Sequence, residues 1–167
     1  MKTIILAGGL GTRIAEYTNK IPKPMIKIGG IPLLTHIMRI FTSYGFNEFI
    51  IAAGYKKKII QKYYLNSKEF KNLQIIDTGK NTMTGGRLLR LKKYFDKGEN
   101  FFMTYGDGLS DLNLKSLKNF HLKHQTLVKV EYRVGLLTQQ VMVVNILEIV
   151  VALVYQLEML LEAKLDQ

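Results

Sequence analysis

Three glycines and two cations near the N-terminus have the types and spacing of a phosphate-binding loop. A short apolar run, residues 3–7, has the length of a buried strand and leads into Gly8-Gly9-Leu10-Gly11-Thr12-Arg13. Glycines let a backbone adopt positive φ and approach a ligand that a Cβ would hold away. Successive N–H groups in such a turn bind anions, and Arg13 and Lys23, the latter between two prolines, add positive charge. We therefore predict that phosphate binds here.

The spacing of these glycines excludes two common nucleotide-binding motifs. A G-x-G-x-x-G motif that began at Gly9 would need glycine at position 14, where the chain has Ile14. A G-x-x-x-x-G-K-[ST] loop is excluded too, because no glycine is followed by Lys-Ser or Lys-Thr. By themselves the glycines leave an ordinary turn at a strand end as an equal alternative, and the two cations favour phosphate binding.

Apolar runs and helical patterns alternate along the chain with short connections. Expected strands cover residues 3–7, 49–53, 73–76, 101–105 and 127–134, and expected helices cover residues 33–44, 56–65, 86–95 and 114–124. This alternation predicts an α/β fold, a mostly parallel sheet with helices on both faces. Ligands of such sheets bind beyond the carboxyl ends of the strands, and Gly8, Asp77 and Asp107 each follow an expected strand. We expect these residues to share one site.

Asp107 is the best candidate for a metal ligand. It lies between Gly106 and Gly108, and Mg²⁺ binds proteins through one or two carboxylates together with phosphate oxygens. An Asp-Gly turn without a ligand is the alternative, since this dipeptide is common in turns.

Several segments resemble the sugar-phosphate nucleotidyltransferase family. Residues 6–13 and Pro22-Lys23-Pro24-Met25 match its signature. Within it, Asp77-Thr78-Gly79, Met83-Thr84-Gly85-Gly86-Arg87-Leu88 and Thr104-Tyr105-Gly106-Asp107-Gly108 resemble the glucose-1-phosphate cytidylyltransferases. The resemblance covers Met1 to about Leu127. It implies a Rossmann-like three-layer sandwich of the nucleotide-diphospho-sugar transferase type. It also implies cytidylyl transfer from CTP to glucose-1-phosphate, giving CDP-glucose and pyrophosphate for lipopolysaccharide O-antigen biosynthesis.

The resemblance also implies roles for individual residues. Arg13, Lys23 and Asp107 would be catalytic, with Asp107 binding Mg²⁺, Arg13 on the β- and γ-phosphates and Lys23 bridging the phosphates of both substrates. The implied nucleotide-binding residues are Leu6, Ala7, Gly8, Gly9, Leu10, Gly11, Thr12, Arg13, Lys23, Thr82, Arg87, Thr104 and Tyr105. For Arg87, a cation on the surface of a helix is an equal alternative. Asp77 is expected to orient the base-reading loop.

Residues 128–167 differ from the family. Its Pro-Pro-x-Arg-(Phe/Tyr)-Gly and Trp-Ile-Asn-Gly-Gly-Phe segments do not occur, and neither does the context of its second metal-binding carboxylate. We therefore divide the chain into a nucleotide-binding domain, residues 1–127, and a divergent apolar tail, residues 128–167, read from a shifted frame. Within the tail, residues 140–161 favour a core helix or strand over a membrane span. Two alternatives follow: a non-catalytic nucleotide-binding fragment, or a uridylyl or thymidylyl transferase.

The composition of the chain limits the class of protein, its expected location and its expected partners. The chain has 167 residues, 47% of them hydrophobic, which predicts one globular domain, and it has no cysteine for disulfides or thiolate metal sites. Its N-terminus lacks the features of a signal peptide, so we expect a cytoplasmic protein. A net charge of +11 suits two anionic substrates, and we interpret it as a solvated basic surface with no nucleic acid or membrane as partner. A homo-oligomer is possible. His121 and His124 are expected on an exposed helix face.

Overall fold

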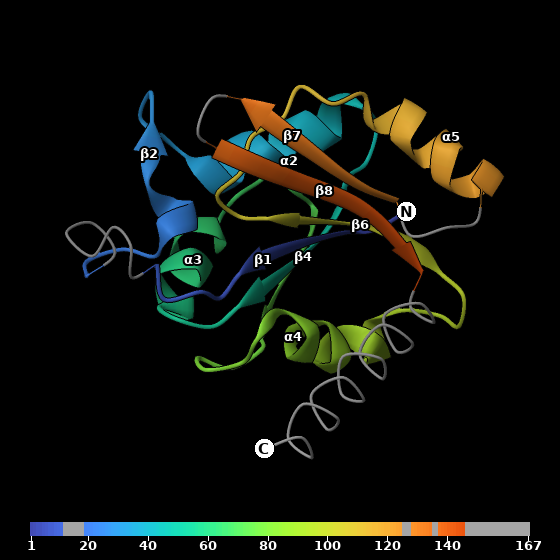
Figure 1. The fold of residues 1–167 in the computed structure, drawn as a ribbon. Helices are drawn as coiled ribbons and strands as arrows, with labels where there is room; N and C mark the ends of the chain where they lie inside the picture. Colours follow the sequence, from blue (N-terminus) through green and yellow to red (C-terminus); the bar gives the residue numbers. More distant parts are fainter. Residues whose placement is uncertain (12–18, 125–127, 135–136, 146–167) are drawn as a thin grey trace, which may run out of the picture.

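The fold is a six-stranded mixed sheet with helices on both faces (Figure 1). The computed structural model describes residues 1–11, 19–124, 128–134 and 137–145. Four strands are parallel: β1 (Thr3–Ala7), β4 (Glu48–Ala53), β5 (Asn72–Asp77) and β6 (Asn100–Tyr105). Two antiparallel strands, β7 (Val128–Val134) and β8 (Leu137–Asn145), extend the sheet beyond β6, and the order is β5-β4-β1-β6-β8-β7. The predicted α/β fold, a mostly parallel sheet between helices, is confirmed.

The parallel strands begin and end within one residue of their expected positions, because each is a short apolar run that closes at a glycine or an aspartate. The segment expected at 127–134 forms β7. Residues 140–145 of the apolar run form part of β8, and residues 146–161 of that run lie outside the described residues. No described helix is both long and apolar enough to cross a membrane.

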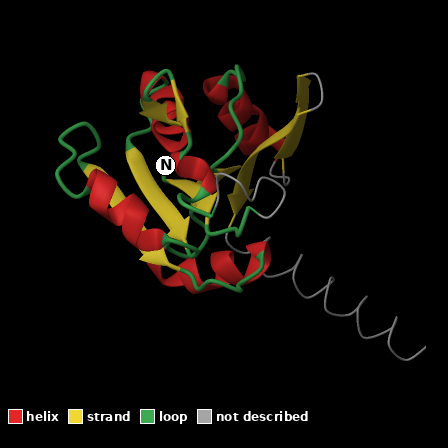
Figure 2. Ribbon diagram, turned by 90° about the vertical axis from the view of Figure 1, so that its left-hand side faces the viewer, coloured by secondary structure: helices red, strands yellow, loops and turns green. Residues whose placement is uncertain are grey.

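Alternate side chains of the four parallel strands enter two separate apolar clusters. Ile5, Phe49 and Phe102 belong to a cluster with helices α2 (Leu33–Ser43), α3 (Lys57–Tyr64) and α5 (Leu114–His124). Ile4, Ile50 and Phe101 face the opposite way and pack with α4 (Thr84–Leu91), which a 3-10 turn, Lys92–Tyr94, continues. Figure 2, turned by 90°, shows helices on either side of the strands. This period of two is what a sheet buried on both faces requires.

Helix boundaries follow local signals. Pro32 precedes the first turn of α2. The helix ends at Ser43, one residue before its expected end, and Gly45, with a φ of +87°, follows it. Helix α4 begins at Thr84, two residues before its expected start.

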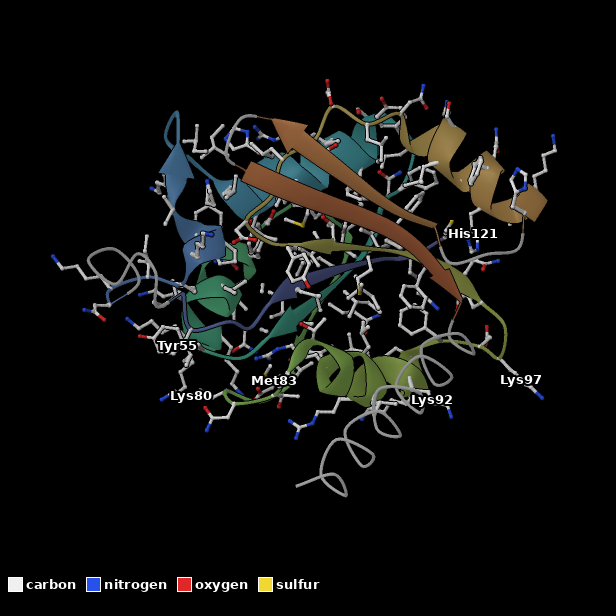
Figure 3. All side chains as sticks on the ribbon, viewed as in Figure 1. Tyr55, Lys80, Met83, Lys92, Lys97 and His121 are labelled. Carbon is white, nitrogen blue, oxygen red and sulfur yellow. The ribbon has the colours of Figure 1, made fainter. Side chains whose placement is uncertain are left out.

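The prediction that His121 lies on an exposed helix face is wrong. His121 is 3% exposed, and its Nε2 lies 2.9 Å from Asn100 Oδ1 at the beginning of β6 (Figure 3). It follows Leu114 and Leu117 at the spacing of one helix face, so α5 turns it toward the sheet.

Candidate functional site

The loops after β1, β4, β5 and β6 meet at one edge of the sheet, because these strands are parallel. Backbone hydrogen bonds connect them in order across the sheet. They run from Tyr55 N to Gly8 O (3.3 Å), from Thr78 N to Ala53 O (2.8 Å) and from Gly106 N to Leu6 O (3.0 Å). Gly8, Asp77 and Asp107 therefore lie at the same edge, as the positions of the strands predicted.

Arg87 lies beneath these loops and is 5% exposed. Its Nη2 donates to Gly8 O at 2.9 Å, and its Nη1 donates to Thr78 Oγ1 at 2.6 Å and to Gly79 O at 2.8 Å. Burial, and then repulsion by Arg90, lower the pKa of the Arg87 guanidinium below its ordinary value. The alternative of a surface cation is wrong, because α4 turns Arg87 inward on the same face as Leu88 and Leu91.

The glycine loop has one inward and one outward position. A Cβ at Gly8 would lie 2.0 Å from Arg87 Nη1, whereas a Cβ at Gly9 would have no atom of the described residues within 4 Å. Gly11 adopts the left-handed conformation expected for this loop, with a φ of +66°. The exposed backbone around Gly9 is thus open to a ligand, and the space behind Gly8 is filled.

Other predicted residues of this loop fall into three groups. Leu6 and Ala7 are the last residues of β1, their side chains are buried on opposite faces of the sheet, and Leu6 O accepts the Gly106 N–H. Leu10 is exposed. Thr12 and Arg13 lie outside the described residues.

Lys23 and Asp107, 84 residues apart in the sequence, form an ion pair between Nζ and Oδ2. Lys23 begins a short 3-10 helix, Lys23–Met25, whose Pro24 lies against Gly106, where a Cβ would be 2.9 Å from the proline Cγ. The rigid proline segment and the glycine together hold the two charges in contact. Both side chains are more than a third exposed (39% and 34%), so a ligand can reach them.

The loop after β5 is organised by Asp77. Its Oδ1 accepts the Gly79 N–H at 2.9 Å, and its Oδ2 pairs with Lys57 Nζ from α3. Gly79 has a φ of +86°, and a Cβ there would lie 2.6 Å from the hydroxyl of Thr82. Asp77 thus orients the loop that holds Thr82, as the resemblance implied.

Aromatic and basic side chains surround the same edge. The Tyr55 ring lies 5.9 Å from Lys80 Nζ and 5.2 Å from Lys56 Nζ, and Figure 3 shows Tyr55 and Lys80 together on one side. At the end of β6, Thr104 is buried, and the half-buried Tyr105 packs against the apolar cluster of α4. These two residues face opposite sides of the sheet.

An acid titration tests the role of Asp77. Its pKa is lowered by the hydrogen bond from Lys57 and then by that from the Gly79 N–H. The folded chain therefore loses this proton at lower pH than the unfolded chain, and the stabilisation is lost as the pH falls from about 4 through the lowered pKa. Exposure of the pair keeps the effect modest. Urea unfolding of Asp77→Asn should show a weaker loss of stability below about pH 4 than the wild type. Asp111 is exposed, so Asp111→Asn is the control. If Asp77→Asn lost as much stability below about pH 4 as the wild type, this role of Asp77 would be contradicted.

A divalent metal ion would have Asp107 as its protein ligand here. The described residues contain no group of three or more histidine, cysteine, aspartate or glutamate side chains that could enclose a metal ion. One accessible carboxylate beside the glycine loop would fit Mg²⁺, which takes its remaining ligands from phosphates and water.

The close packing at Gly54 was not predicted from the sequence. A Cβ at this position would lie 2.5 Å from Gly79 O and 2.7 Å from Arg87 Nη1. Glycines at the ends of two neighbouring strands, β1 and β4, were the available signal, since such glycines mark close approach by another group.

Comparisons with known proteins identify the family of this chain and agree with its fold. The family model for nucleotidyl transferases matches residues 2–140. The chain is 42% identical over 146 residues to a glucose-1-phosphate cytidylyltransferase of Salmonella typhimurium, covering 74% of this chain and 57% of that protein. It is 42% identical over 142 residues to a probable glucose-1-phosphate cytidylyltransferase of Bacillus subtilis, covering 72% and 56%. The chain thus spans less than three fifths of the length of these relatives.

Two solved structures show the same fold. HddC from Yersinia pseudotuberculosis, complexed with GMP-PN, has a TM-score of 0.69 at 22% identity, covering 87% of this chain and 76% of that one. UDP-glucose pyrophosphorylase, complexed with UDP-glucose, has a TM-score of 0.67 at 20% identity, covering 80% and 57%. From its glycine loop, its sheet and its match to the family over most of its length, this chain belongs to the nucleotidyl transferase family.

Proposed function

We propose that this chain forms the nucleotide-binding part of a glucose-1-phosphate cytidylyltransferase. The Lys23–Asp107 ion pair beside the glycine loop is the observation that carries the proposal, because it brings together a cation that could bind two phosphates and a carboxylate that could bind Mg²⁺. The identity of 42% to enzymes with this name supports CTP and glucose-1-phosphate as substrates. The product would be CDP-glucose, made in the cytoplasm for O-antigen biosynthesis.

The reaction would be attack by a phosphate oxygen of glucose-1-phosphate on the α-phosphorus of CTP. A new P–O bond forms, the bond to the β-phosphate oxygen breaks, and pyrophosphate leaves with the electron pair. Such transfer depends on alignment and on neutralising charge. The N–H groups of residues 8–12 would bind triphosphate oxygens, with Arg13 on the β- and γ-phosphates.

Lys23 would exchange Asp107 for phosphate when the substrates bind. Its ammonium would bridge the phosphates of both substrates and stabilise the charge on the α-phosphorus. Asp107, released from this pair, would hold Mg²⁺, whose contribution is to neutralise phosphate charge.

The nucleoside would lie against the loop of Thr82 and Arg87 and against the end of β6, Thr104 and Tyr105. Hydroxyl and peptide groups there suit cytosine, which offers an amine donor and a carbonyl acceptor. A second candidate function is nucleotide binding without turnover. It is favoured because the match covers 57% of a relative and because the described residues contain no group of three or more histidine, cysteine, aspartate or glutamate side chains that could hold a metal ion.

Pyrophosphate release tests the proposal. The purified chain would be incubated with Mg²⁺ and glucose-1-phosphate, and with CTP, UTP or dTTP in parallel. Turnover with CTP alone supports the cytidylyltransferase, and turnover with UTP or dTTP reassigns the base. Equilibrium dialysis of CTP separates the remaining cases: binding without turnover indicates the non-catalytic function, and no binding rejects the site.

A further inference from the structure

We propose that Arg87 is a positioning residue, which fixes the glycine loop through its backbone carbonyls and acts on the nucleotide through that loop. The inference rests on the proposed function and concerns the same site. It gives Arg87 a different task from reading the base directly.

The donors of Arg87 are already committed to protein oxygens. Nη1 and Nη2 of an arginine carry four N–H donors between them. Five oxygens lie within 3.4 Å of these two atoms: Gly8 O, Ala53 O, Thr78 Oγ1, Gly79 O and Lys80 O. They come from the loop after β1, the last residue of β4 and the loop after β5. One buried cation therefore joins two loops of the site and the end of the strand between them.

Two glycines make room for this guanidinium. A Cβ at Gly8 would lie 2.0 Å from Nη1, and a Cβ at Gly54 would lie 2.7 Å from the same atom. A side chain at either position would push the guanidinium from its acceptors. Gly8, Gly54 and Arg87 are thus one matched set, although Arg87 is 79 residues from Gly8 in the sequence.

The planar shape of the group matters as well as its charge. A guanidinium presents its donors as a rigid fork, whereas the ammonium of lysine is a compact point with three donors. A lysine at position 87 would keep the positive charge and lose most of the five contacts. Gly8 O would then be left without its charged donor, and the peptide groups of the loop would lose their fixed orientation.

Two local readouts on the full chain test this role. In Arg87→Lys, amide exchange at Tyr55, whose N–H donates to Gly8 O, should become about tenfold faster or more. CTP affinity should fall by a similar factor. Exchange at Phe102, whose N–H donates to Lys2 O at 2.9 Å at the far end of the sheet, should stay as in the wild type. Arg39→Lys is the matched control, because it makes the same change in an exposed ion pair with Glu69.

Chemical rescue distinguishes positioning from a general loss of stability. In Arg87→Ala, methylguanidinium should restore CTP affinity and slow exchange at Tyr55, whereas methylammonium should do neither. If Arg87→Ala does not fold, the Arg87→Lys comparison decides the question.

Each remaining result is decisive. Weaker CTP binding with unchanged exchange at Tyr55 overturns the proposal, because it means that Arg87 contacts the nucleotide itself. Unchanged binding and exchange in Arg87→Lys overturn it too. A wild type that does not bind CTP rejects the proposed function, and exchange at Tyr55 in Arg87→Lys still decides whether Arg87 fixes the loop.

Discussion

Replacing Lys23 with alanine is expected to lower pyrophosphate release from CTP by about 10²–10³-fold, the usual loss for one preorganised charge-stabilising group. Lys23 carries the positive charge that pairs with Asp107 at the edge of the sheet where the glycine loop lies. In the proposed reaction, the phosphates of the two substrates would lose a shared cation in this variant, and the charge that develops at the α-phosphorus would not be balanced. Steady-state kinetics with Mg²⁺, CTP and glucose-1-phosphate measure the effect.

Lys27→Ala is the matched control. Lys27 is an exposed lysine four residues further on, in the short strand β2 (Lys27–Ile28), and its removal changes the net charge equally. Its rate should remain within a factor of about two of the wild type, as expected for screened surface charge. Equal losses in Lys23→Ala and Lys27→Ala would show that overall charge matters and would contradict a specific role for Lys23.

The second large effect is expected from Gly8→Ala, which should lower the free energy of unfolding by about 1–3 kcal/mol, as overpacking of a filled site does. The new Cβ would lie 2.0 Å from Arg87 Nη1 in a buried position. Gly9→Ala adds the same methyl group to the next residue, where no atom in the described part of the chain lies within 4 Å, and should change stability by less than about 0.5 kcal/mol. Urea unfolding compares the two variants.

CTP binding by the Gly8→Ala and Gly9→Ala variants distinguishes the roles of the two glycines further. Gly9→Ala fills space that we assign to the nucleotide, so its affinity for CTP should fall although its stability does not. In Gly8→Ala, both the CTP affinity and the stability should fall. Adding Arg87→Ala to this variant should remove the steric clash and restore part of the lost stability. Equal stability of Gly8→Ala and Gly9→Ala would refute the arrangement of Arg87 behind the loop.

The strands, and the position of Asp107 at the same edge of the sheet as the glycine loop, were predictable from the sequence, whereas the ion pair between Lys23 and Asp107 was not. Strands β1 and β6 are short apolar runs closed by glycine, so their bounds could be set to within one residue. Because their carboxyl ends meet at one edge, the rule for ligand sites in parallel sheets placed Asp107 beside the glycine loop.

The buried positions of Arg87 and His121 were not predicted, because a nucleotide contact or a helix surface was expected for Arg87 and an exposed helix face for His121. Each lies on the apolar face of its helix: Arg87 four residues before Leu91, and His121 four residues after Leu117. Helical spacing indicated burial at both positions. Their partners could not be found in this way, since Gly8 O and Asn100 Oδ1 come from distant strands.

The order of the strands has a consequence for synthesis on the ribosome. The glycine loop emerges first, and β4 and β5 then add outward on one side of β1, before β6 pairs on its other side. The ion pair between residues 23 and 107 and the bond between Gly8 and Arg87 span 84 and 79 residues. Contacts between residues so far apart in the sequence form late, and they slow folding. The proposed nucleotide therefore cannot guide the early steps of folding. The chain should become able to bind it only once β6 has left the exit tunnel.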